Sequence, residues 1–151
     1  MRFDYIEEHV DPLPGEVGQQ IIYVPQILVR VTGPAGTWLI PGILDTGSAE
    51  TLLPRRYLER LGLDVGPRYN LTGAGGQEFP AWLGQVDLEL FQGRRTHYRW
   101  SARVGFVVGR DRALWGHAGF LDHFTARFDG LEKVVDLRSN GTFPPPIHDV
   151  V

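Results

Sequence analysis

The chain has no cysteine among its 151 residues, which excludes disulfide bonds and thiolate chemistry. It also lacks any run of about 18 apolar residues, the length that a membrane-spanning helix needs. A strong excess of one charge is missing too, because the formal net charge is -3. That balance argues against nucleic acid or an anionic membrane as a partner. Since residues 1–5 lack the apolar core of a signal peptide, we expect a cytoplasmic protein.

Several common site patterns are also missing. None of the five histidines stands in a His-x-x-x-His or His-Glu-x-x-His spacing, which argues against a zinc site. The glycine-rich segment 71–79 has no Gly-x-x-x-x-Gly-Lys-Ser/Thr pattern, which argues against a phosphate-binding loop. No Gly-x-Ser-x-Gly turn is present for a serine hydrolase. We therefore expect neither a metal ion nor an organic cofactor.

Short strand-like segments dominate a chain whose length suits a single domain. They cover residues 20–31, 37–44, 82–91 and 96–108, and Pro25 interrupts the first of them. Residues 125–130 and 133–137 form a hairpin pattern with an Asp-Gly turn. A short helix is expected over residues 54–61, with Gly62 beyond its end. The pattern predicts an all-β protein, a small closed barrel or sandwich with short helices.

One segment carries more chemistry than the others. It follows the apolar residues Ile43 and Leu44 and reads Asp45, Thr46, Gly47, Ser48. A buried strand would deliver the Asp45 carboxylate into a tight glycine turn. Two carboxylates held in contact share one proton, so one acts as a base and the other as an acid at the same pH. The four residues are also ordinary turn formers, and a glycosidase pair of Asp45 with Asp122 or Asp136 stays open.

Two further motifs accompany this segment. Downstream, the residues Leu114, Trp115, Gly116 are followed by Ala118, Gly119 and a Phe-Leu pair. Between the two lies a glycine-rich segment that contains Gly73, Ala74, Gly75, Gly76. Its glycines can supply the positive dihedrals of a tight hairpin turn. The order and separation of the three elements, over roughly residues 20–138, resemble those of the single-domain, retropepsin-like aspartic proteases.

The resemblance implies a small closed acid-protease barrel with one or two short helices for residues 19–138. Residues 1–18 would be an extended arm, and residues 139–151 a proline-rich tail that is extended or disordered. Since the chain has a single Asp-Thr-Gly, the resemblance implies an aspartic endopeptidase that acts as a symmetric homodimer on a peptide or protein substrate. Asp45 of each copy would form the catalytic dyad.

Roles for the neighbouring residues follow from the same resemblance. Thr46 would brace the two active-site loops, Gly47 would admit their close approach, and Ser48 would hydrogen-bond the carboxylate. Residues 73–76 would form a flap over the substrate. Gly116, after Leu114 and Trp115, would let the aspartate loop cross closely.

Two features depart from the family. Retroviral members pair an acidic residue shortly after Asp-Thr-Gly with a basic residue after the second glycine, whereas this chain has Ala49, Glu50 and His117 there. A Glu50–His117 contact would be the substitute, with a pH-sensitive partner. The long ends differ as well, since retroviral termini interleave at the dimer interface. These departures leave a second function open, a non-catalytic dimerisation or peptide-binding module.

Overall fold

Six strands close a barrel in the computed structural model, which describes residues 1–150. Around the barrel they follow the order β4 (Gln26–Gly33), β5 (Gly36–Leu44), β10 (Ala113–Trp115), β6 (Leu52–Pro54), β9 (Arg95–Val107) and β8 (Glu78–Gln92). The barrel closes because β8 pairs back onto β4, with Val31 opposite Leu88. The predicted all-β closed barrel is confirmed by this strand order.

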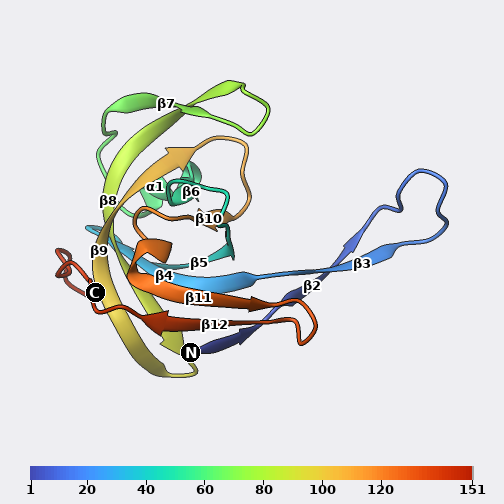
Figure 1. Cartoon of the computed structure of the whole chain (residues 1–151). Coiled ribbons are helices and arrows are strands. Elements are labelled where there is room, and N and C mark those ends of the chain that lie inside the picture. Colours follow the sequence, from blue (N-terminus) through green and yellow to red (C-terminus); the bar gives the residue numbers. More distant parts are fainter. Residues whose placement is uncertain (151) are drawn as a thin grey trace.

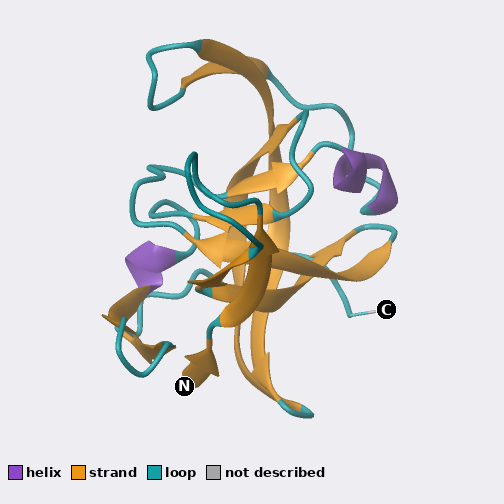
Figure 2. Cartoon of the chain, turned by 90° about the vertical axis from the view of Figure 1, so that its right-hand side faces the viewer, coloured by secondary structure: helices purple, strands orange, loops and turns teal. Residues whose placement is uncertain are grey.

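The other elements extend the barrel (Figure 1). The strand β7 (Arg68–Thr72) pairs with the start of β8, and a separate sheet has the order β1 (Arg2–Asp4), β12 (Val134–Ser139), β11 (Phe124–Asp129). A two-stranded ribbon joins β2 (Ile6–Val10) to β3 (Gln20–Val24). The two short helices, α1 (Arg56–Arg60) and the 3-10 turn η1 (Leu121–His123), lie at the periphery of the strands (Figure 2). Within residues 1–150, no helix is long and apolar enough to cross a membrane.

The strand β4 shows how sequence alternation becomes a barrel wall. From Gln26 to Val31 every second residue is buried, namely Ile27, Val29 and Val31. Leu28, between them, is exposed, as expected when successive side chains point to opposite faces. Pro25 separates β3 from β4, as predicted, because it has no N–H for the strand ladder. Its carbonyl still accepts the backbone N–H of Leu44 at 2.9 Å, which holds this end of β4 beside β5.

Residues 1–18, expected as an extended arm, form two strands with different partners. β1 pairs with β12, so that Phe3 lies opposite Val135 and packs against the core. β2 pairs with β3, so the ribbon that they form spans the boundary expected between residues 18 and 19. The reason is that β1 finds its partner more than 130 residues away, a pairing that local composition does not encode.

Aromatic side chains fill much of the core. The largest fully buried ones are Trp100, Trp115, Phe106 and Phe120. The ring of Trp100 stands edge-on to Phe120 at 5.5 Å and to Phe124 at 5.7 Å between centroids. Edge-to-face pairs of this kind stabilise a fold by about 0.5–1.5 kcal/mol each beyond the burial of their area. The cluster packs η1 and the start of β11 onto β9.

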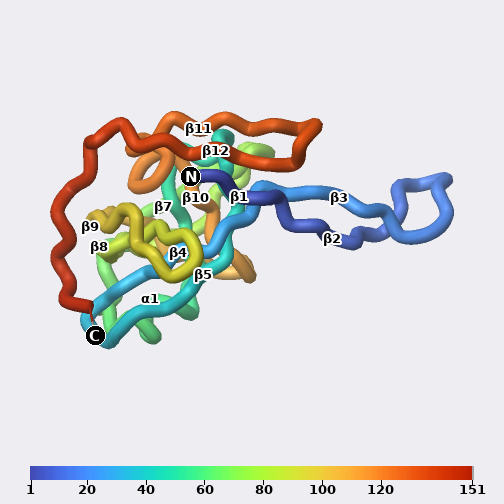
Figure 3. Tube along the Cα trace, turned by 90° about the horizontal axis from the view of Figure 1, so that it is seen from below, coloured from blue at the N-terminus to red at the C-terminus, as the bar shows by residue number. Residues whose placement is uncertain are grey.

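A buried carboxylate holds the C-terminal tail in place. Figure 3 shows that the tail runs along the side of the body opposite the β2–β3 ribbon. Asp87, on β8, has a fully buried side chain that accepts the backbone N–H groups of Ile147 at 2.9 Å and His148 at 2.8 Å. Arg99 also donates to it, at 3.0 Å. These hydrogen bonds therefore dock the tail on the body.

Asp87→Asn is expected to lower the free energy of unfolding by about 3 kcal/mol, because it removes one partner of a buried ion pair. The asparagine side chain also brings its own N–H group towards Arg99 and the backbone N–H groups of the tail, which need an acceptor. Asp149→Asn is the matched control, since Asp149 is an exposed tail residue, and its unfolding curve should overlay that of the wild type. Urea unfolding measures both variants, and equal midpoints for the two would contradict the role assigned to Asp87.

Candidate active site

Asp45 lies directly after β5, where a parallel pairing with β10 ends at Leu44 and Trp115. Its backbone N–H continues that pairing by donating to the Trp115 carbonyl at 3.1 Å. The backbone N–H of Gly47 donates to the Asp45 carboxylate oxygen Oδ1 at 2.9 Å, and that of Ser48 donates to the Asp45 carbonyl at 3.2 Å. The carboxylate is thus held at the mouth of a tight turn and stays partly exposed.

Two loops cross at van der Waals distance beside Asp45. The backbone N–H of His117 donates to the Ser48 carbonyl, and that of Ala118 donates to the Ala49 carbonyl, both at 2.9 Å. A Cβ atom built on Gly116 would lie 2.1 Å from the Glu50 carbonyl oxygen, closer than any side chain tolerates. This close approach requires glycine at position 116.

A groove of about 410 Å³ lies over Asp45. The aspartate turn forms its floor, and the tip of the β7–β8 hairpin forms its cover. Of the four glycine-rich residues singled out in the sequence, Gly73 and Ala74 line the groove, whereas Gly75 and Gly76 lie beyond it as exposed residues of the turn. The other lining residues come from the aspartate turn, β6, β7, β8, β10 and the loop before β10: Gly47, Ser48, Ala49, Glu50, Leu52, Leu71, Thr72, Phe79, Arg110 and Leu114.

The hairpin that covers the groove turns at Gly76, whereas Gly75, for which a positive φ was also expected, does not have one. Gly73 donates to the Gln77 carbonyl at 2.8 Å, and Gly76 donates to the Gly73 carbonyl at 2.9 Å. Gly76 has a φ of +79°, a conformation that glycine adopts at little cost and β-branched residues avoid. The turn therefore depends on the glycine at this position.

The expected Glu50–His117 contact is wrong. Glu50 accepts a hydrogen bond from the Tyr69 hydroxyl at 2.8 Å. His117 instead places its ring atom Nε2 2.8 Å from the Thr46 carbonyl, and its Nδ1 lies 3.9 Å from Asp122. Burial, followed by the bond to Glu50, raises the pKa of the Tyr69 hydroxyl, which therefore remains a donor. The acidic and basic positions that pair in the retroviral pattern thus find separate partners on separate elements.

Ser48 and Thr46 also differ in detail from expectation. The Ser48 hydroxyl donates to the Glu50 carbonyl at 2.7 Å, so its partner is backbone and not the Asp45 carboxylate. The Thr46 side chain is exposed. The Thr46 carbonyl, and not its hydroxyl, contacts the second loop, through the ring of His117. Both residues therefore support the turn within one copy of the chain.

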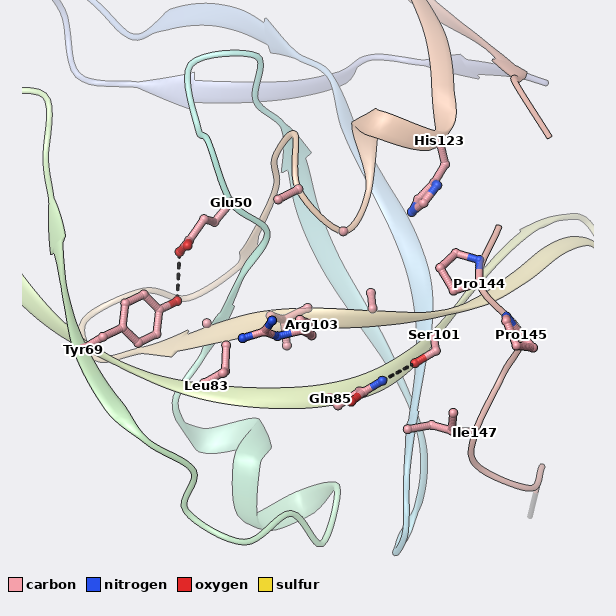
Figure 4. A pocket seen from close by; sticks show the side chains of 15 residues that line it. Glu50, Tyr69, Leu83, Gln85, Ser101, Arg103, His123, Pro144, Pro145 and Ile147 are labelled. Carbon is pink, nitrogen blue, oxygen red and sulfur yellow. Dashed lines mark hydrogen bonds between the residues drawn. The ribbon is translucent and has the colours of Figure 1, made fainter. Parts of the chain in front are cut away.

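A larger cavity of about 670 Å³ adjoins the groove, between β8, β9 and the tail (Figure 4). Glu50 lines both spaces, and its bond to Tyr69 stands at their boundary. Deeper in the cavity, the amide of Gln85 donates to the Ser101 hydroxyl at 2.9 Å. The tail forms the wall on the other side through Pro144, Pro145 and Ile147.

The groove does not support the alternative pairing of Asp45 with Asp122 or Asp136. Asp45 and Glu50 are the acidic residues that line the groove, and neither Asp122 nor Asp136 is among its lining residues. Asp136 is instead engaged by Arg2 through two hydrogen bonds of 2.9 Å, which lower the pKa of that carboxyl. Among residues 1–150, no three histidine or acidic side chains gather in a way that could hold a metal ion.

Sequence reasoning missed two residues of the site. Arg110 reaches the groove from the β9–β10 connection, and Tyr69 holds Glu50 from β7. Arg110 looks like any charged turn residue in the sequence. Tyr69 carried a weak signal, because it precedes the glycine-rich segment by four residues and so belongs to the hairpin that covers the groove.

Among solved structures, the chain is similar to a retropepsin-like aspartic protease from Rickettsia conorii. The TM-score is 0.46 and the sequence identity 19%, over 80% of this chain and 98% of that chain. No family model matches the chain, and a search of curated proteins gives no match. A likeness at this level assigns neither a family nor an activity.

Gly116→Ala is expected to destabilise the fold by about 3 kcal/mol, because the added methyl overlaps a backbone carbonyl that cannot move without opening the loop crossing. Gly130→Ala is the control, since a Cβ atom on Gly130 meets nothing within 4 Å. Thermal or urea unfolding compares the two variants. If Gly116→Ala unfolds at the same denaturant concentration as Gly130→Ala, the close contact between the two loops is contradicted.

Proposed function

We propose that the protein is an aspartic endopeptidase that acts as a symmetric homodimer. The observation that carries the proposal is the placement of the Asp45 carboxylate in the floor of a groove that a glycine-tipped hairpin covers. One copy supplies one such carboxylate, and a two-fold axis beside Asp45 would bring the second one to it. Residues 19–138 would form the protease domain.

The chemistry needs only the two carboxyl groups and a water molecule. The ionised Asp45 takes a proton from the water, whose oxygen attacks the carbonyl carbon of the peptide bond. The protonated Asp45 of the other copy gives its proton to the carbonyl oxygen, which forms a neutral tetrahedral intermediate. When the C–N bond breaks, a proton passes to the leaving nitrogen, and a carboxylic acid and an amine result. Because one carboxyl must be protonated, this mechanism favours acidic over alkaline pH.

The residues around Asp45 have supporting roles in this proposal. The Gly47 N–H holds the orientation of the carboxylate, and the cross-loop bond between His117 and the Thr46 carbonyl keeps the turn rigid. Gly73 and Ala74 would close over an extended peptide. The charged groups Glu50 and Arg110 lie in the same groove and would select among peptide side chains. No metal ion or organic cofactor enters the mechanism.

Asp45→Asn is expected to reduce the hydrolysis of a peptide substrate by about 10³-fold or more, since an amide cannot take up the proton of water. Asp64→Asn is the matched control, because Asp64 is an exposed residue between α1 and β7, and it should keep full activity. Both proteins are assayed at equal concentration, with circular dichroism as a check of folding. Near wild-type cleavage by Asp45→Asn would refute the mechanism. A wild type that binds peptides without cleaving them would favour the non-catalytic module.

Gly76→Val is expected to lower kcat by about tenfold, because valine resists the positive φ at the tip of the covering hairpin. Gly141→Val is the control, since Gly141 has a matching φ of +80° in the tail and, like Gly76, meets nothing within 4 Å of a built Cβ atom. Both substitutions should cost a similar stability of about 1–3 kcal/mol. If turnover falls equally in the two variants, the loss reflects stability, and the hairpin is not a flap.

A further inference from the structure

The β2–β3 ribbon, residues 6–24, stands away from the body of the protein (Figure 1). Its two strands pair with each other from Ile6 opposite Val24 to Val10 opposite Gln20, and they form a sheet of their own. An isolated two-stranded hairpin is only marginally stable in water. A ribbon of this length therefore gains from a surface to pack against.

The ribbon also exposes apolar side chains. The large hydrophobic residues that it leaves exposed are Ile6, Leu13, Val17, Ile21, Ile22 and Tyr23. They lie on both strands and on the loop that joins them. A gathering of this kind on one projecting element is typical of a surface that another protein covers.

The base of the ribbon is fixed beside the candidate catalytic residue. The Pro25 carbonyl, directly after β3, accepts the N–H of Leu44, the residue before Asp45. Glu8 on β2 forms an ion pair with Arg112 just before β10. In Figure 1 the ribbon leaves the body on the side towards which the tip of the β7–β8 hairpin points. A second copy that brings its Asp45 to the first must approach this same face, where the ribbon would meet it.

The distribution of charge also favours a second copy of the chain as the partner of the ribbon. The ribbon, residues 6–24, contains four acidic residues and no lysine or arginine. Of the 18 acidic residues in the chain, 14 remain outside the ribbon, against all 15 lysine and arginine residues. The ribbon is thus acidic while the rest of the chain carries a small positive excess. An acidic, apolar ribbon and a slightly basic body are complementary between two copies of one chain.

We propose that the ribbon of each copy clasps the body of the other copy and so holds the two Asp45 residues together. This inference rests on the homodimer of the proposed function and gives that dimer its interface. It assigns to residues 6–24 the interface role that chain termini have in retroviral proteases, because β1 here is already paired within its own copy.

The first test removes apolar surface from the ribbon while keeping its strands. In the double variant Ile21→Thr/Ile22→Thr, threonine retains the β-branched shape that strands favour. We expect the dimer dissociation constant, measured by sedimentation equilibrium, to rise at least about tenfold above that of the wild type. Peptide cleavage should fall at low protein concentration and recover at high concentration. Val65→Thr, at an exposed site between α1 and β7, should leave the constant unchanged.

The second test locates the contact and does not depend on weakening it. Because the chain has no cysteine, Val17→Cys provides a single thiol at the tip of the ribbon, where Val17 is fully exposed. This variant is labelled with a benzophenone maleimide and mixed with isotopically heavy wild type. Illumination should join the light ribbon to heavy peptides from the body. Val65→Cys, labelled in the same way, should give few such products.

The outcomes separate the clasp from the protease. If the double variant dimerises as tightly as the wild type, or the cross-links stay within one copy, the clasp is wrong, while an active wild-type dimer still supports the proposed function. Cross-links to an added peptide substrate in place of the heavy copy would assign the ribbon to substrate binding and overturn the clasp. A wild type that stays monomeric at every concentration removes the clasp, and if that monomer cleaves peptides, the symmetric dyad falls with it.

Discussion

The backbone contact between the Asp45 turn and the Gly116 loop is the constraint on which the rest of the site depends. Four segments meet there: the ends of β5 and β10, the turn after Asp45 and the chain leading to η1. A Cβ atom at position 116 would overlap the Glu50 carbonyl, so the approach is available only to glycine. Because backbone atoms make the contact, the position of the Asp45 carboxylate depends little on side-chain rotamers.

The barrel places this crossing where a groove can form. β8 pairs with β4, β9 and β7 at different points along its 15 residues, so its first part reaches beyond the closed barrel with β7 as the covering hairpin. The groove over Asp45 therefore has a rigid floor and a thin, glycine-tipped cover. This division suits a site that must admit a chain and then enclose it.

Buried charge fixes the C-terminal tail in a way that apolar packing alone would not. An unpaired carboxylate inside a protein is costly, so Asp87 specifies the donors that surround it. Two of these donors are backbone N–H groups of the tail. The tail therefore has one docked position. In that position it forms one wall of the larger cavity beside Glu50. The β2–β3 ribbon is the opposite case, because the ion pair of Glu8 with Arg112 and the contact of Lys133 with the Tyr23 ring tie it to the body while its large apolar side chains stay exposed.

The sequence by itself determined the features whose cause is local. The strand break at Pro25, the short helix after Pro54 and the positive dihedral at the glycine-rich turn follow from backbone chemistry, and all were predictable. Only the tertiary structure decided which distant groups become partners. Glu50 meets Tyr69 and not His117, Asp87 meets the tail, and β1 meets β12, because strand order and closure of the barrel select these neighbours. A sequence offers many acceptable partners for a carboxylate or an edge strand. Packing in three dimensions brings only one of them into contact.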